Sequence, residues 1–125
     1  MTRPSMRVSA TVLGTSDPRA LGAFYERLLG WTVVDDEPAW VRLQAPSGAG
    51  LSFQLEPDHV PPVWPATPGD QQMMAHLDIG VDDLAAGVAW AVEAGASVAG
   101  HQPQERVRVL LDPAGHPFCL FLEGS

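Results

Sequence analysis

The sequence contains no lysine, a single cysteine and no long apolar run, and each shortage excludes a class of protein. The seven basic residues are all arginines and 15 residues are acidic, which gives a formal net charge of −8. Nucleic-acid affinity rests chiefly on neutralising phosphates with Lys and Arg, so no nucleic-acid partner is expected. Cys119 has no second cysteine to pair with, which excludes an internal disulfide and a cluster of cysteine metal ligands.

The apolar residues are too scattered for a membrane protein. No segment approaches the roughly 18 consecutive apolar residues of a membrane span, and residues 1–6 lead into no apolar core of a secretory signal. The chain has 125 residues, of which 46% are hydrophobic and 18% are charged, as is ordinary for one globular domain. We therefore expect a soluble, cytoplasmic, single-domain protein (residues 1–125) with no membrane partner.

What the sequence does contain is an internal repeat. Shifting the chain against itself by about 65 residues superposes the signals for a strand, a turn and a helix. The matched pairs are Leu13 with Ile79, Gly14 with Gly80, Asp17 with Asp83, Phe24 with Trp90, Gly50 with Gly115 and Phe53 with Phe118. Each half therefore predicts the same βαβββ module, with module one at about residues 6–56 and module two at about residues 72–123. Residues 57–71 are rich in proline and predict an irregular linker.

Local patterns predict one helix in each half. Ser16 or Asp17 can cap a first helix that ends at Gly30. Asp82 or Asp83 opens a second helix that runs to about residue 94, and its apolar stripe places Trp90 in the core. Strands are expected at residues 7–13, 31–35, 40–44 and 51–55 in module one and at residues 73–80, 96–101, 106–111 and 117–122 in module two.

Side-chain alternation along these strands separates a surface that packs on a helix from a surface that faces a cavity. The apolar set that should pack on the first helix is Val41, Leu43, Leu51, Phe53 and Leu55. The cavity-facing set comprises Trp40, Arg42, Ser52 and Gln54 from module one and His76, Asp78, Cys119 and Phe121 from module two. If the two modules face each other, Gln54, His76, Asp78 and Cys119 converge. Trp64 on the linker is a further candidate, because a flat aromatic side chain there can stack on a ligand.

Three motifs follow one another in a recognisable order. They are Phe24-Tyr25-x-x-Leu28-Leu29-Gly30-Trp31, His76-Leu77-Asp78-x-x-Val81-Asp82-Asp83-Leu84 and Asp112-Pro113-x-Gly115-His116-Pro117-Phe118. Together they resemble the vicinal oxygen chelate (glyoxalase/bleomycin-resistance/dioxygenase) superfamily, and specifically its glyoxalase-like branch common in actinobacteria. The resemblance covers nearly the whole chain. It implies an α+β fold in which two βαβββ modules form a cupped mixed β-sheet with the helices on the outside, and commonly a homodimer.

The resemblance also implies where a metal would bind. Metal-dependent members take four ligands, typically His, Gln or Glu, from the first and fourth strands of each module, and in this chain those positions are Ala10, Gln54, His76 and Cys119. The repeat gives the same pairing, Ala10 with His76 and Gln54 with Cys119. Alanine cannot ligate, and a lone thiol in an apolar strand is usually inert. We therefore expect the metal chemistry to be lost and no cofactor to be needed. If a divalent metal is present, His76 and Gln54 are its expected ligands.

The leading expectation is a glyoxalase-like protein that binds a small organic molecule, planar or cationic, in the cup. The alternative is a metal-dependent lyase, isomerase or dioxygenase that acts on a vicinal-oxygen substrate. A third possibility is a structural dimer whose concave face is plugged by Trp40 and Met74. Asp112 is expected to hold its turn by accepting backbone N–H groups rather than to take part in catalysis.

Overall fold

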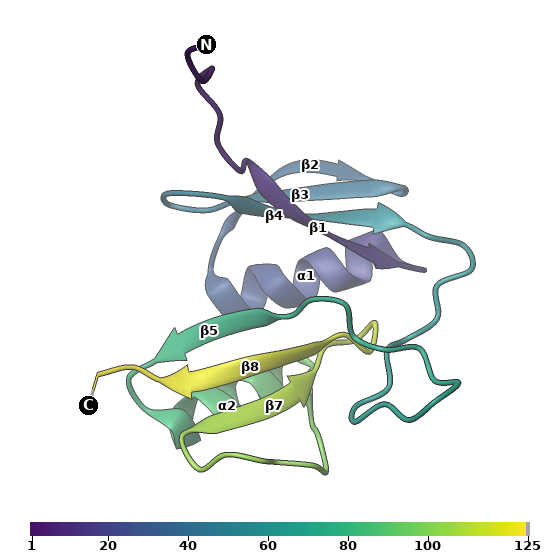
Figure 1. Ribbon diagram of the computed structural model, residues 1–125, viewed down its shortest axis with the longest axis vertical. Coiled ribbons are helices and arrows are strands. Elements are labelled where there is room, and N and C mark those ends of the chain that lie inside the picture. Colours follow the sequence, from purple (N-terminus) through teal and green to yellow (C-terminus); the bar gives the residue numbers. More distant parts are fainter. Residues whose placement is uncertain (125) are drawn as a thin grey trace. The chain divides into compact units, whose positions relative to one another are not determined.

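The computed structural model describes residues 1–124, and the chain divides into two compact units, Met1–Pro57 and the segment that begins at Asp58. The first unit contains β1 (Ala10–Thr15), α1 (Pro18–Leu29), β2 (Thr32–Glu37), β3 (Trp40–Gln44) and β4 (Gly50–Leu55). The second contains β5 (Leu77–Val81), α2 (Leu84–Ala94), β6 (Ser97–Val98), β7 (Val107–Leu111) and β8 (Pro117–Leu122) (Figure 1). Both units follow the order βαβββ, which confirms the predicted repeat and the α+β class.

Each module has its own mixed four-stranded sheet. The strand orders are β1-β4-β3-β2 and β5-β8-β7-β6, so the same topology occurs twice. The first strand of each module pairs in parallel with the last, and the other neighbours are antiparallel. In each module the helix lies on one face of that module's own sheet (Figure 1). The opposite face of each sheet is therefore free of helix cover from its own module.

An aspartate caps each helix. The cap is Asp17 and not Ser16 in α1, and Asp83 and not Asp82 in α2. The Asp17 side chain accepts a hydrogen bond from the backbone N–H of Ala20, and the Asp83 side chain accepts one from Ala86. Each carboxylate satisfies an amide that would otherwise have no partner within its helix. At the other end of α1, Gly30 adopts a left-handed conformation with a φ of 70°, and its N–H donates to the Glu26 carbonyl. Residues with a side chain adopt this conformation with difficulty.

The core of module one follows the predicted alternation with one exception. Val41, Leu43, Leu51 and Phe53 are all buried, and Tyr25 of α1 stacks on Phe53 with 5.6 Å between ring centroids. The prediction was wrong for Leu55, which is 38% exposed because it lies one position beyond Gln54, the last β4 residue with a β3 partner. Ser52 lies on the opposite face of β4, as predicted, but it is fully buried there, and its hydroxyl has no hydrogen-bond partner among the described residues.

The second helix buries a different face from the one predicted. Trp90 is 58% exposed, whereas Ala91 and Ala94 are buried. All residues of α2 except Gly87 and Glu93 are apolar, so the helix has no polar side that would identify its outer face. The alignment of Trp90 with the buried Phe24 therefore gave a wrong placement.

Both parallel ladders begin later than predicted. β1 begins at Ala10, opposite Gly50, and β5 begins at Leu77, opposite Phe118. On the β8 side, the residue before Phe118 is Pro117, which has no N–H to donate to a ladder. His76 consequently lies immediately before β5 and not within it. β6 is also shorter than predicted, at two residues.

The proline-rich segment is irregular, as predicted, and it is anchored to module two. The His59 ring donates from Nε2 to the Ala114 carbonyl (2.8 Å), and the Trp64 indole donates to the His101 carbonyl (3.2 Å). Within the segment, the N–H of Val63 donates to the carbonyl of Gln71 (2.8 Å). These bonds hold the linker at both ends of the stretch that contains Trp64.

Asp112 has the structural role that the sequence predicted. Its carboxylate is almost fully buried and accepts hydrogen bonds from the backbone N–H groups of Ala114 (2.9 Å) and His116 (3.0 Å). Gly115, between these two residues, has a φ of 87°. The turn between β7 and β8 is therefore held by one side chain and one glycine.

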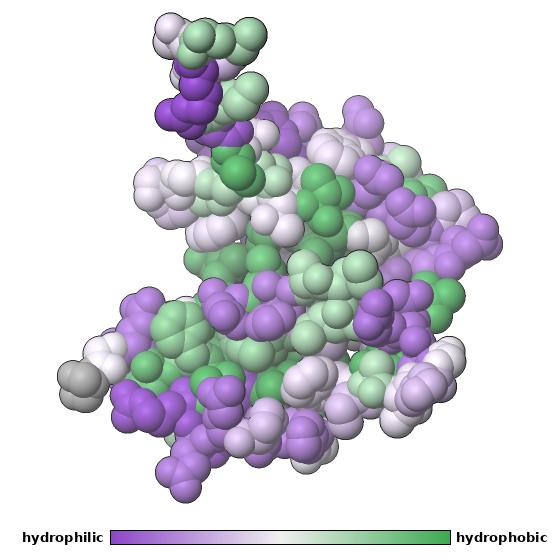
Figure 2. Space-filling view, in the orientation of Figure 1, coloured by the Kyte–Doolittle hydropathy of each residue, from purple (hydrophilic) through white to green (hydrophobic). Residues whose placement is uncertain are grey.

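Apolar and polar side chains alternate over the surface of module two. Figure 2 shows apolar side chains reaching the surface over β5 and β8, with hydrophilic side chains beside them.

Within residues 1–124, neither helix has the length and apolar character needed to cross a membrane.

Replacing Asp83 with alanine should lower the free energy of unfolding by about 0.5–2 kcal/mol, because the first turn of α2 loses its side-chain cap. Asp82→Ala is the matched control, since it removes the neighbouring carboxylate without removing the bond to Ala86. Urea denaturation followed by circular dichroism measures both. Equal losses in the two variants would contradict the assignment of Asp83 as the cap.

Candidate functional site

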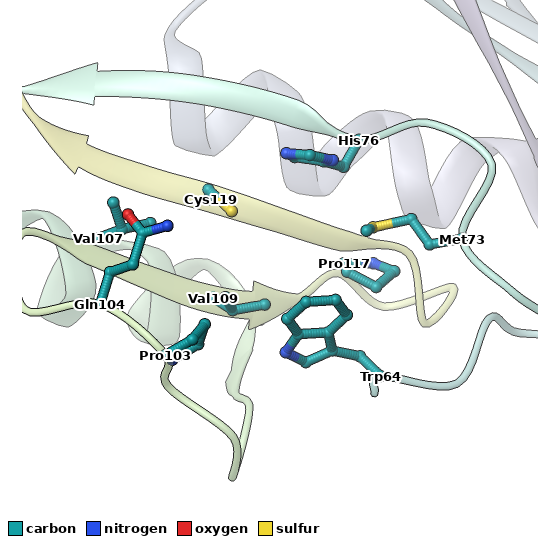
Figure 3. A pocket seen from close by; sticks show the side chains of 9 residues that line it. All are labelled: Trp64, Met73, His76, Pro103, Gln104, Val107, Val109, Pro117 and Cys119. Atoms are coloured by element: carbon teal, nitrogen blue, oxygen red, sulfur yellow. The ribbon is translucent and has the colours of Figure 1, made fainter. Parts of the chain in front are cut away.

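A cavity of about 160 Å³ opens within module two (Figure 3). Its lining is formed by Trp64, Met73, His76, Pro103, Gln104, Val107, Val109, Pro117 and Cys119. Most of these side chains are apolar, and His76 and Gln104 supply the strongly polar groups. Figure 3 shows Trp64 and Met73 at one end of the cavity and Gln104 and Val107 at the other, with Cys119 between them.

The sheet places part of this lining by simple alternation. Cys119 on β8 is the ladder partner of Val109 on β7, so both side chains point to the same face. Their neighbours along the strands, Phe118, Leu120 and Leu110, are fully buried on the opposite face. The face that turns away from the core therefore carries the thiol.

Trp64 forms an aromatic wall that does not belong to the sheet. Its indole N–H is occupied by the His101 carbonyl, and its ring lies 5.8 Å from the His101 ring at an angle of 51°. Because the N–H already has a partner, the part of the side chain left for a ligand is the face of the ring. The linker thus contributes the largest side chain in the cavity lining.

His76, Asp78 and Cys119 form a compact group at this site. Their candidate ligand atoms all lie within 4.8 Å of one another. His76 Nε2 and Asp78 Oδ1 are 3.0 Å apart, and Asp78 is the ladder partner of Cys119 in the parallel pair β5–β8. The imidazole is 36% exposed and the carboxylate 61%, so the group is open to solvent.

The environment of Cys119 keeps its thiol protonated at neutral pH. Burial raises the pKa of the thiol, and the charge and the hydrogen bond of Asp78 raise it further. A thiolate is the reactive form of cysteine. Without a bound cation, Cys119 is therefore a poor nucleophile.

The predicted site residues of module two are largely brought together. Trp64, His76 and Cys119 line the cavity, and Asp78 adjoins it through its contacts with His76 and Cys119. Phe121 is half-buried on β8 opposite Gly80 and does not belong to the cavity lining found within residues 1–124.

The predicted residues of module one occupy their own sheet. Trp40 is half-buried at the start of β3, and Arg42 forms an ion pair with Asp35 (2.7 Å). Gln54 is exposed on β4, where its amide donates to the Glu56 carboxylate (2.8 Å). Convergence of Gln54 with His76 stays a prediction.

The four family positions for a metal do not form a complete donor set in this chain. Ala10 carries no donor atom, so module one can offer only the amide oxygen of Gln54, a weak neutral ligand. Ala10 instead lines a second, more polar cavity of about 360 Å³ in module one, together with Arg7 and Arg42. The residues present therefore do not fit the four-ligand metal site of the superfamily.

Several cavity residues were not identified from the sequence. Val107 and Val109 lie two positions apart on β7, so their side chains point to the same face. The alternation argument used for β8 could have identified both of them. Met73, Pro103 and Gln104 lie outside helices and strands, where no periodic signal exists. Pro117 has the same parity as Cys119 on β8, so the alternation argument could have identified it as well.

One family model matches most of this chain, and several solved structures share its fold. A model described as a glyoxalase-like domain matches residues 10–121. A glyoxalase/bleomycin resistance protein/dioxygenase family enzyme from Burkholderia phytofirmans PsJN is structurally similar, with a TM-score of 0.70, 20% identity and coverage of 94% of this chain and 98% of that one. A glyoxalase/dioxygenase from Nostoc punctiforme has a TM-score of 0.69 at 19% identity, and both chains are covered completely.

A third similar structure is TnmS3, described as an antibiotic binding protein from Streptomyces sp. CB03234. It has a TM-score of 0.60 and 25% identity, with 98% of this chain and 100% of that chain covered. No curated protein matches this chain by sequence.

Asp78→Asn should lower the pKa of Cys119 and speed its alkylation by iodoacetamide at mildly alkaline pH. The substitution removes the negative charge and the acceptor that hold the proton on sulfur, so more thiolate is present at a given pH. Intact-mass spectrometry over a pH series measures the rate, and the single cysteine makes the signal unambiguous.

The expected wild-type profile has its midpoint above that of an ordinary thiol, and the Asp78→Asn profile moves to lower pH. Asp82→Asn, which alters an exposed carboxylate outside the group, should leave the profile in place. A wild-type profile that Asp78→Asn does not move would show that Asp78 has no influence on the thiol.

Proposed function

This chain belongs to the glyoxalase-like domain family, and we propose that it binds a small organic molecule in the cavity of module two without the four-ligand metal site of the superfamily. The observation that carries the proposal is the wall formed by Trp64. A hydrogen bond to the His101 carbonyl holds this side chain against a cavity whose lining is mostly apolar. A homodimer, a cytoplasmic location and membership of the branch common in actinobacteria stay predictions.

The size of the cavity limits what enters it. A volume of about 160 Å³ is close to the roughly 150 Å³ of an apolar cavity that binds benzene. One six-membered ring therefore fills it, and the remainder of a larger ligand lies outside. Gln104 and His76 are the lining residues that can hydrogen-bond a polar substituent on that ring.

The anchoring of Trp64 favours binding of a flat ring. A side chain already held by a hydrogen bond loses little conformational freedom when a ligand stacks on it. Stacked aromatic pairs contribute about 0.5–1.5 kcal/mol beyond the effect of burial. A planar aromatic group is therefore the ligand chemistry that this wall supports best.

The similar structures support this reading to different degrees. TnmS3, an antibiotic binding protein at 25% identity, is the precedent for ligand binding on this fold. The neighbours from Burkholderia and Nostoc are less than 25% identical and support the fold alone. Planar antibiotics are accordingly the first class of compound to test.

A metal-dependent lyase, isomerase or dioxygenase is the second candidate. The group of His76, Asp78 and Cys119 is the observation that favours it, because these side chains can supply three donors. The absence of a donor at Ala10 argues against the chemistry of the superfamily. Activity on a vicinal-oxygen substrate that chelators abolish would favour this candidate over the first.

Trp64→Ala should weaken the binding of a planar antibiotic at least tenfold, a loss of about 1.4 kcal/mol, while Trp64→Phe should restore most of the affinity. Isothermal titration calorimetry of chelator-treated protein against a panel of planar aromatic antibiotics provides the measurement. Trp90→Ala, which removes an exposed tryptophan of α2, is the control and should bind like wild type. If no planar compound binds, or if Trp64→Ala and Trp90→Ala behave alike, the proposed site is wrong.

A further inference from the structure

We propose that His76, Asp78 and Cys119 form a three-donor site for a zinc ion that lies wholly within module two. This site shares His76 and Cys119 with the four positions of the superfamily, but Asp78 takes the place of both contributions from module one. It goes beyond the binding of an organic molecule and does not depend on it.

The spacing of the three side chains suits one small cation. Zinc bonds to nitrogen and oxygen at about 2.0–2.2 Å and to sulfur at about 2.3 Å, so its tetrahedral donors lie about 3.3–3.6 Å apart. The three candidate atoms already lie within 4.8 Å of one another, and His76 Nε2 is 3.0 Å from Asp78 Oδ1. The present separations are therefore close to those that one zinc ion requires.

The backbone holds two of the three donors in register. Asp78 and Cys119 are partners in the parallel ladder of β5 and β8. His76 lies immediately before β5, and its Nε2 is held 3.0 Å from Asp78 Oδ1. Donors on neighbouring strands are positioned more precisely than donors on loops. The site is therefore largely formed before an ion arrives.

The chemistry of the donors selects the ion. Imidazole nitrogen with thiolate sulfur suits zinc, whereas magnesium and calcium prefer sites made only of oxygen. A doubly charged cation bound by one carboxylate, one thiolate and a neutral imidazole leaves the site with no net charge. Neutrality matters here because most of the adjoining cavity lining is apolar.

The site also has room for a fourth ligand. Asp78 and His76 are both partly exposed, and Cys119 lines the cavity, so water or a donor atom of a bound molecule can reach the ion. Three protein ligands with an open position are typical of reactive zinc sites, whereas structural zinc sites are closed by four. The net charge of −8 additionally favours the approach of a cation.

Cobalt(II) provides the test, because it substitutes for zinc and reports its ligands by absorption. Untagged, chelator-treated full-length protein is titrated with cobalt chloride, and zinc chloride is then added in competition. We expect one equivalent to bind per chain, with visible bands of tetrahedral cobalt and a near-ultraviolet thiolate-to-cobalt charge-transfer band. Zinc should remove both sets of bands.

Three variants identify the donors. Cys119→Ser should abolish the charge-transfer band, and His76→Ala and Asp78→Asn should each weaken cobalt binding at least tenfold. Asp82→Asn is the control carboxylate and should bind cobalt like wild type. Circular dichroism confirms that each variant is folded, so that loss of binding is not loss of structure.

The result that overturns the proposal is equally specific. Binding of less than one equivalent to the wild-type protein, or a spectrum without the thiolate band, would show that these side chains do not hold the ion. A charge-transfer band that survives in Cys119→Ser would do the same. Because the antibiotic titration uses chelator-treated protein, failure of either proposal is recognised without reference to the other.

Discussion

The parallel pairing of β5 with β8 is the constraint on which the candidate site depends. Its register sets Asp78 beside Cys119 and Leu77 beside Phe118. Side chains alternate along a strand, so a slip of one residue would turn the thiol into the core and the Phe118 ring out of it. The burial of Phe118 and Leu120 against α2 therefore fixes the direction of Cys119. A polar group on one face of the sheet is held in place by apolar packing on the other.

The site combines two environments that serve different purposes. The cavity between Trp64 and β7 is apolar and suits a flat ring, whereas the group of His76, Asp78 and Cys119 beside it is polar and open to solvent. Asp78 links them, because its carboxylate contacts the imidazole and also raises the pKa of the thiol in the cavity. A molecule bound against Trp64 is thus next to a group of side chains that can bind a cation.

Sequence patterns predicted the framework well and the cavity only in part. The repeat and a helix start in each half follow from short-range rules and were confirmed, with the cap narrowed in advance to two neighbouring residues in each case. Alternation correctly predicted the burial of every member of the apolar set on β3 and β4 except Leu55. Trp90 was misplaced because α2 is apolar on nearly every side, so periodicity identifies no face. Gln104 and Met73 could not be predicted, since their positions depend on the path of irregular segments. The first residues of β1 and β5 were also predicted wrongly, because each strand begins where its parallel partner can pair with it.

The linker that carries Trp64 lies outside the helices and strands, and this separation matters for how the cavity can evolve. Trp64 takes part in no strand pairing, so changing it, or lengthening the segment around it, leaves every backbone hydrogen bond of the β5–β8–β7 sheet intact. Under the proposed function, mutations at this wall alter which molecule is accepted while the strand pairing of the sheet is kept. Ligand preference in such a protein can therefore evolve in a segment separate from the strands that hold the fold together.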